Sequence, residues 1–327
     1  DSVEVVETHM SFVFLAGERV YKLKKPVRYP FLDFTTLAAR RANCEAEVRL
    51  NRRLAPEIYL GVVPLVTGPD GTLALHADGE EVDVLVVMRR LPEPRMLDRT
   101  IAAGRLVEAD LDRIADTLAA FYSTAERPAL DPADHLAVLA GEQARNREVI
   151  GALARRAGLE AASGVLESLD ARIAADRPLL EERVRARRIV DGHGDLKPEH
   201  VCLVEPVVVF DCLEFARRLR LVDPFDEIAF LGLECALLAP EAGAAGEGRA
   251  GKPGVSGAAV GPALRDRVAA RLGDHPPERL FDLYTAFRAV LRARLSLAHL
   301  LDAEPREPER WGPQAARYLR VAADALG

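Results

Sequence analysis

The sequence predicts an α+β protein of two lobes: a small β-rich N-terminal lobe with one helix and a larger, mainly helical C-terminal lobe. Two observations support this prediction. Short runs rich in β-branched and aromatic residues dominate residues 1–91. Long runs with apolar residues at helical spacing dominate residues 92–327, where a β-like island at 188–210 interrupts them. We therefore expect an N-terminal lobe of about 90 residues and a second, larger C-terminal domain that begins at residue 92, in line with ordinary domain sizes.

The N-terminal lobe is expected to be a sheet with one inserted helix. The helix is predicted over residues 37–54, with Thr35 or Thr36 as its N-cap and Pro56 after its end. A run of glycine, proline and aspartate at 68–71 predicts a turn before a hairpin arm. The strands are expected at residues 3–6, 12–15, 19–23, 61–66, 72–76 and 81–91.

The C-terminal lobe is expected to consist mostly of long helices. The clearest has apolar residues at positions 107, 111, 114, 118 and 121, which form one stripe. Helices are predicted at residues 107–122, 133–156, 160–187, 226–238, 278–301 and 313–326, and short strands at 188–191, 201–204 and 207–210. Residues 240–262 are nearly all Ala, Gly, Pro, Glu and Ser, which predicts a flexible loop.

Composition excludes several classes of protein. The chain has 327 residues with 44 basic and 51 acidic ones, a formal net charge of −7, which disfavours nucleic acid or an anionic membrane as main partner. No apolar run reaches the roughly 18 residues that span a bilayer. Residues 1–8 lack the basic-then-apolar pattern of a signal peptide. The four cysteines form no CxxC pair, so we expect neither a zinc knuckle nor a disulfide framework, and a cytoplasmic location.

One stretch carries groups suited to phosphoryl transfer. Residues 191–200 read DGHGDLKPEH, and Asp211 follows at the end of the next strand-like run. Phosphoryl transfer needs a carboxylate to orient the attacking hydroxyl, a role that suits Asp195. Mg²⁺ prefers carboxylate oxygen, which suits Asp211. His200 is placed to be a second ligand, although imidazole is softer than the donors that Mg²⁺ prefers.

A phosphate-binding cation is expected in the N-terminal lobe. Lys22 and Lys24 alternate with apolar residues along one strand, so both point to the same face. Glu47 on the following helix is the expected ion-pair partner for one of them, with Glu45 as the alternative. Such a lysine, held by a carboxylate, neutralises the non-transferring phosphates of a nucleotide.

These motifs resemble those of the aminoglycoside phosphotransferase family, part of the protein-kinase-like superfamily. Residues 193–200 resemble its HGDxxxxN catalytic loop, with Asp195 at the catalytic aspartate. Residues 209–214 resemble its metal motif, with Asp211 at the metal-binding position. Residues 223–229 resemble its GDPxxDLA segment, and residues 284–294 resemble the helix that follows. The resemblance covers most of the chain and implies a protein-kinase-like two-lobed fold.

The resemblance also implies cofactors and a nucleotide site. ATP or GTP is expected to bind with Mg²⁺ in the N-terminal lobe, with Asp211 and His200 on the metal. Lys22, paired with Glu47, is expected on the α- and β-phosphates, and Lys24 is the rival. The residues expected around the nucleotide are Ser11, within the turn at 7–11, and Met88, Arg89 and Arg90, within the hinge at 88–91.

The implied activity is that of a small-molecule kinase. The γ-phosphate is transferred to a hydroxyl of a sugar, amino sugar, aminoglycoside or amino alcohol that the helical lobe contacts. The resemblance is closest to a bacterial subgroup whose members are sometimes fused to a P-loop ATPase domain, so a functional link to such a domain is also implied.

Two departures from the family pattern support other functions. His200 stands where the family has asparagine, and the first turn has no glycine-rich loop. The main alternative is therefore a nucleotide-binding pseudokinase or regulatory module without phosphotransfer. A further alternative is a metal-dependent hydrolase in which His193, Asp195, His200 and Asp211 converge on Zn²⁺ or Mn²⁺.

Several polar residues keep two interpretations. His193 is expected to support the catalytic loop from below. Glu214 is expected either at the metal or as a closing contact of its loop, and Glu227 as a structural acid or cap, with a catalytic acid as the second interpretation. The arginines at 288, 292 and 294 are expected to pair with acids, with acceptor contact as the second interpretation.

Overall fold

The computed structural model describes residues 3–29, 32–68, 70–75, 77–238, 254–302, 305 and 307–327. It divides into two compact units. The first unit comprises Asp1–Arg99 together with His193–Asp195 and Glu199–Arg220, and the second comprises Thr100–Gly192, Leu196–Pro198 and Leu221–Gly327. The first unit thus extends past the boundary expected after Leu91 and includes most of the predicted β-like island.

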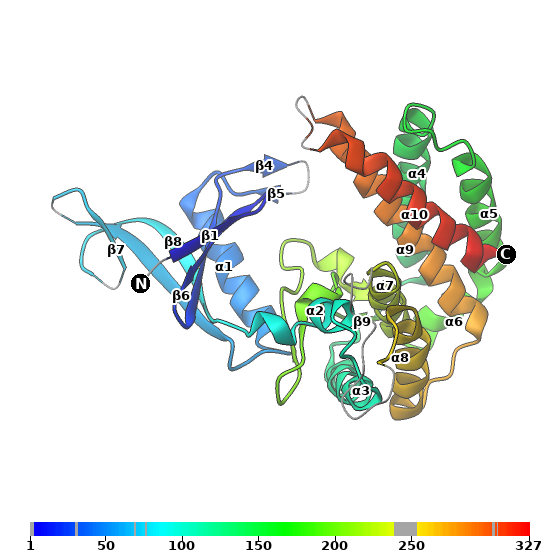
Figure 1. Cartoon of the computed structure of the whole chain (residues 1–327), viewed down its shortest axis with the longest axis horizontal. Helices are drawn as coiled ribbons and strands as arrows, with labels where there is room; N and C mark the ends of the chain where they lie inside the picture. The colour runs from blue at the N-terminus through cyan, green and yellow to red at the C-terminus, as the bar shows by residue number, and fades with distance from the viewer. Residues whose placement is uncertain are drawn as a thin grey trace. The chain divides into compact units, whose positions relative to one another are not determined.

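The first unit is built on one six-stranded sheet, in which every neighbouring pair of strands is antiparallel (Figure 1). The order is β1-β2-β3-β8-β6-β7, so β3 lies inside the sheet. There Lys22 is paired with Val13 on one side and Val86 on the other. The strands are β1 Val3–Glu7, β2 Ser11–Ala16, β3 Arg19–Lys24, β6 Tyr59–Thr67, β7 Leu73–Leu75 and β8 Glu80–Arg89, with a separate hairpin of β4 Arg28–Tyr29 and β5 Leu32–Asp33.

A single long helix, α1 Leu37–Asn51, packs on this sheet against β6 and β8. It begins at the N-cap Thr36, whose hydroxyl accepts a hydrogen bond from the amide of Ala39 at 3.2 Å. Its apolar face buries Cys44 and Val48 in the core of the unit. The predicted helix and its capping residue are therefore confirmed, and the helix ends three residues before the predicted end.

Residues from later in the chain complete that core. The short strands β10 Val201–Cys202 and β11 Val208–Val209 pair with each other, and Met96 forms a bridge to Cys202. Cys202 and Val208 belong to the same buried cluster as Val84 and Val86 of β8. The loops on either side of β10 and β11 therefore start from a rigid, buried base, which fixes where their polar residues lie.

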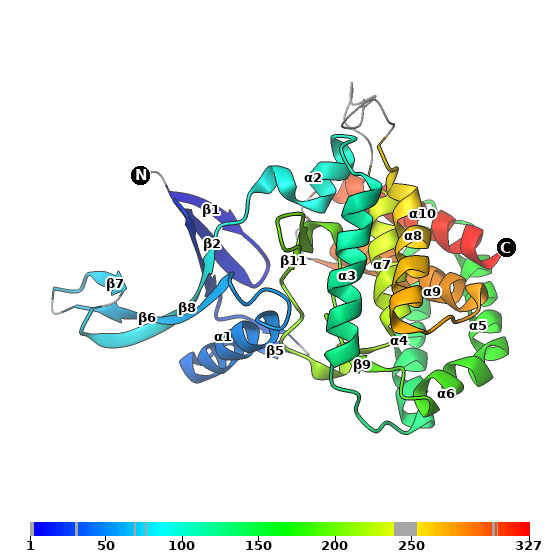
Figure 2. The ribbon, with the colours of Figure 1, turned by 90° about the horizontal axis from the view of Figure 1, so that it is seen from below.

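The second unit is mainly helical (Figure 2). Its long central helix α9 Glu278–Ala298 packs against α10 Pro308–Leu326, α7 Pro224–Ala236, α4 Pro132–Leu153 and α5 Ala162–Ala175. Helix α8 Gly257–Leu272 lies against α7 and α3 Glu108–Thr124. The remaining elements are α6 Arg177–Arg185, the antiparallel pair β9 Val190–Asp191 and β12 Leu221–Val222, and α2 Leu97–Ala102 at the junction of the units.

Three features of the second unit differ from the predicted elements. The helix predicted over residues 160–187 is two helices, α5 and α6, which meet at Asp176 just before Pro178, where proline supplies no amide donor to the preceding turn. Helix α8 begins at Gly257, inside the segment predicted as a flexible loop. Residues 239–253 of that region lie outside the described residues. Helix α2 was not predicted.

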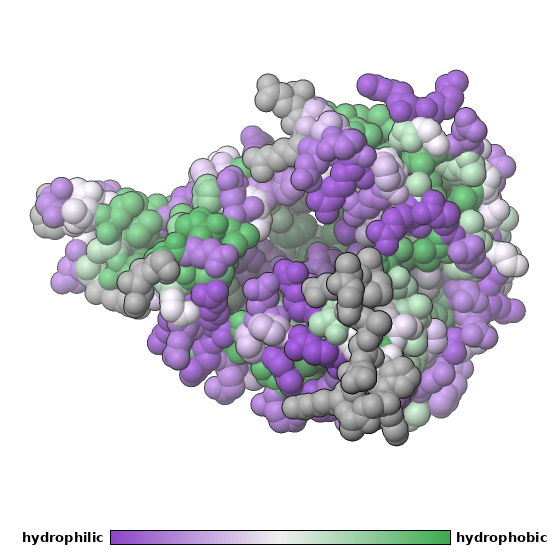
Figure 3. All heavy atoms as spheres, in the orientation of Figure 1, coloured by the Kyte–Doolittle hydropathy of each residue, from purple (hydrophilic) through white to green (hydrophobic). Residues whose placement is uncertain are grey.

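The surface of the molecule is largely polar, with apolar side chains gathered over parts of the sheet (Figure 3). The edge strand β1 contributes to them, since Val3 and Val5 are each 53% exposed. Among the described residues, no helix is both long and apolar enough to cross a membrane.

Candidate functional site

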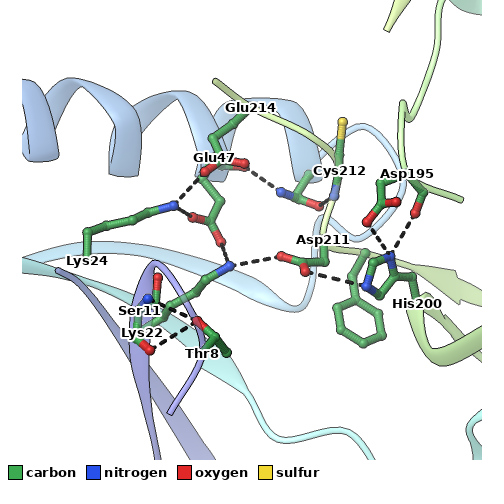
Figure 4. A network of polar contacts seen from close by, with 12 residues as sticks. Thr8, Ser11, Lys22, Lys24, Glu47, Asp195, His200, Asp211, Cys212 and Glu214 are labelled. Atoms are coloured by element: carbon green, nitrogen blue, oxygen red, sulfur yellow. Dashed lines mark hydrogen bonds and ion pairs between the residues drawn. The ribbon is translucent and has the colours of Figure 1, made fainter. Parts of the chain in front are cut away.

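A continuous chain of ion pairs lies in the first unit (Figure 4). The ammonium nitrogen of Lys22 is 2.9 Å from Glu47 Oε1 and 2.9 Å from Asp211 Oδ1. The ammonium nitrogen of Lys24 contacts the other carboxylate oxygen of Glu47 and lies 2.6 Å from Glu214 Oε1. Glu47 is fully buried and is shared by both lysines. The predicted partner thus contacts both candidate lysines, and the contact with Asp211 distinguishes Lys22.

The local structure explains why these residues meet. Lys22 and Lys24 are two positions apart on β3, so their side chains leave the same face of the sheet. Glu47 lies on the buried face of α1, which packs over that sheet. Glu45, the alternative partner, has a side chain that is 57% exposed and contacts Arg41 at 3.8 Å. It therefore takes no part in the network.

The network stays charged at neutral pH. Burial lowers the pKa of Lys22, but Asp211 and Glu47 outweigh it and raise that pKa well above its usual value. Burial raises the pKa of Glu47, but Lys22 and Lys24 hold it below its usual value. Desolvation likewise raises the pKa of Asp211, and Lys22 and then His200 hold it far below its usual value. A fixed ammonium group therefore lies between two carboxylates.

The backbone of Asp211 is held in an unusual conformation. Its φ is 59°, a left-handed value that few non-glycine residues adopt. Its amide donates a hydrogen bond to Tyr59 Oη at 3.2 Å, and the next amide, of Cys212, donates to Asn51 Oδ1 at 2.8 Å. Asn51 in turn donates to the carbonyl of Glu47 at 2.9 Å. Helix α1 and strand β6 therefore fix both the lysine partner and the Asp211 turn.

The sequence interpretation missed Tyr59 and Asn51. Both act through backbone amides of a loop more than 150 positions away, at sequence separations of 152 and 161. No local pattern marks such contacts, because a hydrogen bond to a backbone amide requires no particular residue type on the loop.

His200 links the loop that carries Asp195 to Asp211. Its Nδ1 lies 2.8 Å from the carbonyl oxygen of Asp195, which is only an acceptor, so Nδ1 carries the proton and donates. Its Nε2 lies 3.5 Å from Asp211 Oδ2. The ring is buried, and its centroid lies 5.9 Å from that of Phe210. The two residues predicted to hold a metal therefore face each other.

His193 supports the same loop from inside. Its Nε2 bonds the carbonyl of Phe210 at 2.8 Å, and its Nδ1 accepts from the amide of Asp195 at 3.3 Å. Burial, and then His200, lower the pKa of His193 to about 4, so the ring is neutral at pH 7. Because the protein uses both ring nitrogens, the four-ligand site required by the hydrolase hypothesis is not formed.

Gly194 allows the tight turn that presents Asp195. Its φ is 86°, and an added Cβ would lie 2.9 Å from Arg220 Cγ and 3.1 Å from Leu213 Cβ. Any larger residue would therefore strain the backbone and clash. The carboxylate of Asp195 is 34% exposed, so it remains available to a ligand.

These groups border a cavity of about 710 Å³, a size typical of small-molecule sites. Asp195, Asp211, Lys22, Lys24 and Glu214 supply its charged wall. Of the residues predicted to surround a nucleotide, the cavity is lined by Ser11, Met88, Arg89 and Arg90, together with Lys22. Glu47 and His200 are not among the lining residues, but each contacts one that is: Glu47 contacts Lys22, and His200 lies 3.5 Å from Asp211.

The turn between β1 and β2 is fixed without glycine. The Thr8 hydroxyl donates to the carbonyl of Ser11 at 3.0 Å and accepts from the amide of Ser11 at 2.9 Å. Lys25 donates to the carbonyl of Thr8 at 2.7 Å. Side-chain hydrogen bonds thus hold this edge of the cavity in one conformation, where a glycine-rich loop would present free amides.

Solved structures of known proteins share this architecture. No protein-family model matches the chain. A choline kinase from Cryptosporidium parvum superposes with a TM-score of 0.53 at 9% identity, covering 99% of this chain and 89% of that one. A choline/ethanolamine kinase family protein from Mesorhizobium loti superposes with a TM-score of 0.50 at 14% identity, covering 98% and 92%. The chain has a protein-kinase-like fold. The fold class predicted from the motifs is confirmed.

A sequence relative of this kinase-like chain is an uncharacterized protein of Mycobacterium tuberculosis, 34% identical over 331 residues. The match covers 99% of this chain and 60% of the relative. The chain therefore spans about 60% of the length of the curated relatives that it matches.

The donors present at this site fit a cation only when another ligand completes its coordination. Among the described residues, no three His, Cys, Asp or Glu side chains are grouped to hold a metal ion by themselves. Asp211 and His200 supply two donors, and Glu214 is occupied by Lys24. Phosphate oxygens and water would have to supply the other ligands of a cation, as is usual for Mg²⁺ in kinases.

In the second unit of the kinase-like fold, the remaining polar candidates have partners. Tyr122 donates to the buried Glu227 at 2.9 Å, and a Cβ on Gly192 would lie 2.8 Å from Glu227 Oε2. Glu227 thus packs against the start of the catalytic loop. The arginines pair with acids as predicted: Arg288 with Asp226 at 2.6 Å, Arg292 with Glu234 at 2.8 Å and Arg294 with Glu142 at 2.8 Å.

Proposed function

We propose that the chain is an ATP- and Mg²⁺-dependent small-molecule kinase that transfers the γ-phosphate to an acceptor hydroxyl. One observation carries the proposal: the Glu47–Lys22–Asp211 ion-pair chain and Asp195 face one cavity whose size suits a nucleotide. The kinase-like fold supports it, because this arrangement occupies the expected lobe of that fold.

Lys22 is the group that would neutralise the non-transferring phosphates. Its ammonium stays charged, and Glu47 holds it from the buried side while its other contacts face the cavity. Ser11 on one side, and Met88, Arg89 and Arg90 on the other, would border the rest of the nucleotide. Lys24 is committed to Glu47 and Glu214, which supports Lys22 as the phosphate ligand.

Asp195 would act on the acceptor. It orients the hydroxyl and takes its proton as the new O–P bond forms and the bond between the γ-phosphorus and the bridging oxygen of ADP breaks. Asp211 and His200 would hold the cation. Bound Mg²⁺ supplies charge neutralisation on the phosphates. Gly194 and the hydrogen bonds of His193 keep the Asp195 backbone in place during this step.

The acceptor class proposed is a sugar, amino sugar, aminoglycoside or amino alcohol. The names of the two superposed kinases support an amino alcohol. A functional link with a P-loop ATPase domain and a cytoplasmic site of action remain part of the proposal.

The test is acceptor-dependent formation of ADP. Purified protein is incubated with ATP and Mg²⁺ and, in separate reactions, choline, ethanolamine, glucosamine or an aminoglycoside. We expect ADP to rise with one acceptor class and to fall to background in Lys22→Met. Nucleotide binding without ADP formation on any acceptor would instead support the pseudokinase alternative, which His200 and the glycine-free first turn favour.

A further inference from the structure

The orientation of the His200 ring is set by the protein before any metal binds. Nδ1 donates to the carbonyl oxygen of Asp195 at 2.8 Å, so Nε2 is the ring nitrogen that a cation can take as a ligand. Metal-binding histidines commonly use this arrangement, in which one ring nitrogen donates to a carbonyl and the other binds the ion. The ring is 7% exposed and lies beside the rings of His193 and Phe210.

The free nitrogen faces a carboxylate at a distance that suits a shared ion. Nε2 of His200 and Oδ2 of Asp211 are 3.5 Å apart. Two ligands that each bind one cation at about 2.1 Å lie about 3 to 4 Å apart, for bond angles between about 90° and 120° at the cation. No change of rotamer is needed to bring both donors onto one ion.

The donor pair is therefore one nitrogen and one carboxylate oxygen. Mg²⁺ is a hard cation that selects oxygen donors, whereas imidazole nitrogen binds first-row transition-metal cations more strongly. An asparagine at position 200 would instead offer an amide oxygen. The histidine at position 200 therefore replaces an oxygen ligand of the metal with a nitrogen ligand.

We propose that His200 makes this site selective for a first-row transition-metal dication, bound with the nucleotide, over Mg²⁺. The inference rests on the proposed nucleotide site and goes beyond it by naming the cation class and the residue that sets it. The cation is held between His200 Nε2, Asp211 and the nucleotide phosphates. Mg²⁺ binds the same place more weakly.

The test uses Mn²⁺, which is paramagnetic, with ADP and the purified chain. Electron spin-echo envelope modulation of bound Mn²⁺ reports a nitrogen nucleus in direct contact with the ion. We expect ¹⁴N modulation from one imidazole in the wild type and none in His200→Asn. His9→Asn is the matched control, because His9 is a histidine of the cavity lining that lies in the first turn, and it should keep the modulation.

A second readout is the ratio of cation affinities, from calorimetric titration of Mn²⁺ and Mg²⁺ into the ADP complex. The wild type should bind Mn²⁺ at least about tenfold more tightly than Mg²⁺, and His200→Asn should reduce that ratio severalfold. Mn²⁺ bound without ¹⁴N modulation in the wild type, with the same ratio in both proteins, would overturn the inference while leaving metal-dependent nucleotide binding intact. Nucleotide binding that neither cation affects would overturn both proposals.

Discussion

Each unit contains a cluster of buried charged side chains. The two clusters are built from similar groups but differ in the solvent exposure of their outermost side chains. In the second unit, Arg183 binds Asp223 Oδ2 at 2.6 Å and Asp274 Oδ1 at 2.7 Å, and Tyr284 donates to Asp223. The three charged side chains are 7%, 1% and 9% exposed. This cluster is closed, and it joins α6, the start of α7 and the segment after α8.

The cluster in the first unit is open at one end. Glu47 is fully buried, Lys22 is 16% exposed and Asp211 is 40% exposed, so exposure rises toward the cavity. Its exposed carboxylate also lies on a left-handed backbone. Buried ion pairs by themselves are weak evidence of function. A candidate site therefore differs from a structural cluster in two ways: one of its charged side chains is exposed at a cavity, and the backbone of that residue is strained.

The largest effect is expected from the loss of Asp195, the carboxylate proposed to act on the acceptor hydroxyl. Asp195→Asn should lower the rate of phosphotransfer by about 10² to 10⁴, because it removes the group that accepts the hydroxyl proton. The affinity for ATP and the melting temperature should stay close to those of the wild type, since Asp195 is partly exposed. Steady-state kinetics measure the rate of phosphotransfer, and calorimetry measures the ATP affinity and the melting temperature.

Asp266→Asn is the control for that variant, because Asp266 is 68% exposed and pairs with the adjacent Arg265. Its kinetics should match the wild type. An equal loss of rate in both variants, or an unchanged rate in Asp195→Asn, would refute the role given to Asp195.

The closed cluster should respond in the opposite way. Arg183→Met removes the cation that the buried Asp223 and Asp274 share, although Arg188 stays 3.6 Å from Asp274, and should lower the free energy of unfolding by about 3 to 5 kcal/mol. The affinity of the folded protein for ATP should remain unchanged. Arg185→Met on the same helix, where Arg185 is 55% exposed, should change stability by no more than about 0.5 kcal/mol. Urea unfolding measures the stability, and calorimetry the ATP affinity, of the wild type, Arg183→Met and Arg185→Met. A loss of ATP affinity in Arg183→Met with unchanged stability would contradict the structural role given to this cluster.

A smaller effect is expected where the first unit supports the strained turn. Tyr59→Phe removes the oxygen that accepts from the amide of Asp211. We expect metal-dependent ATP affinity to fall by about 1 kcal/mol, or about fivefold. Tyr21→Phe, on strand β3 of the same sheet, should have no such effect. Equal affinities in wild type and Tyr59→Phe would show that the turn is held without Tyr59.

The smallest effect concerns pH and belongs to the second unit. Burial lowers the pKa of His135 below its usual 6.5, and Asp226 and Asp223 offset this only in part. The unfolded chain therefore binds a proton more readily than the folded protein. This contribution to stability is present above about pH 6.5 and is lost as pH falls through the lower folded pKa. Unfolding free energies measured across this range should fall less steeply for His135→Gln, and identical slopes would contradict the assignment.

Much of the fold could be predicted because periodicity in the sequence reflects local geometry. The strands around Lys22 and the helix that carries Glu47 follow from alternation and from the cap at Thr36. Helix α8 was missed because its first residues, from Gly257, have the small-residue composition of a loop, and packing against α7 favours the helix there. The break between α5 and α6 was missed because the Ala- and Arg-rich composition of residues 160–187 favours helix throughout, and Pro178 was not taken as the start of a new helix.

The site could be predicted only in part. Asp195, Asp211 and Lys22 were found because phosphoryl transfer demands those residue types, and the structure brings them to one cavity. Tyr59 and Asn51 could not be found, since they act on backbone amides far along the chain. The left-handed conformation of Asp211 was equally hidden, because no glycine marks it.

We propose that Asp211, at the exposed end of the first unit's ion-pair network, binds a nucleotide through a metal. Calorimetric titration of ATP with and without Mg²⁺, on the wild type and on Asp211→Asn, tests it most directly. We predict that Mg²⁺ tightens ATP binding to the wild type and that Asp211→Asn abolishes this gain. ATP binding that is indifferent to both Mg²⁺ and the substitution would contradict the claim.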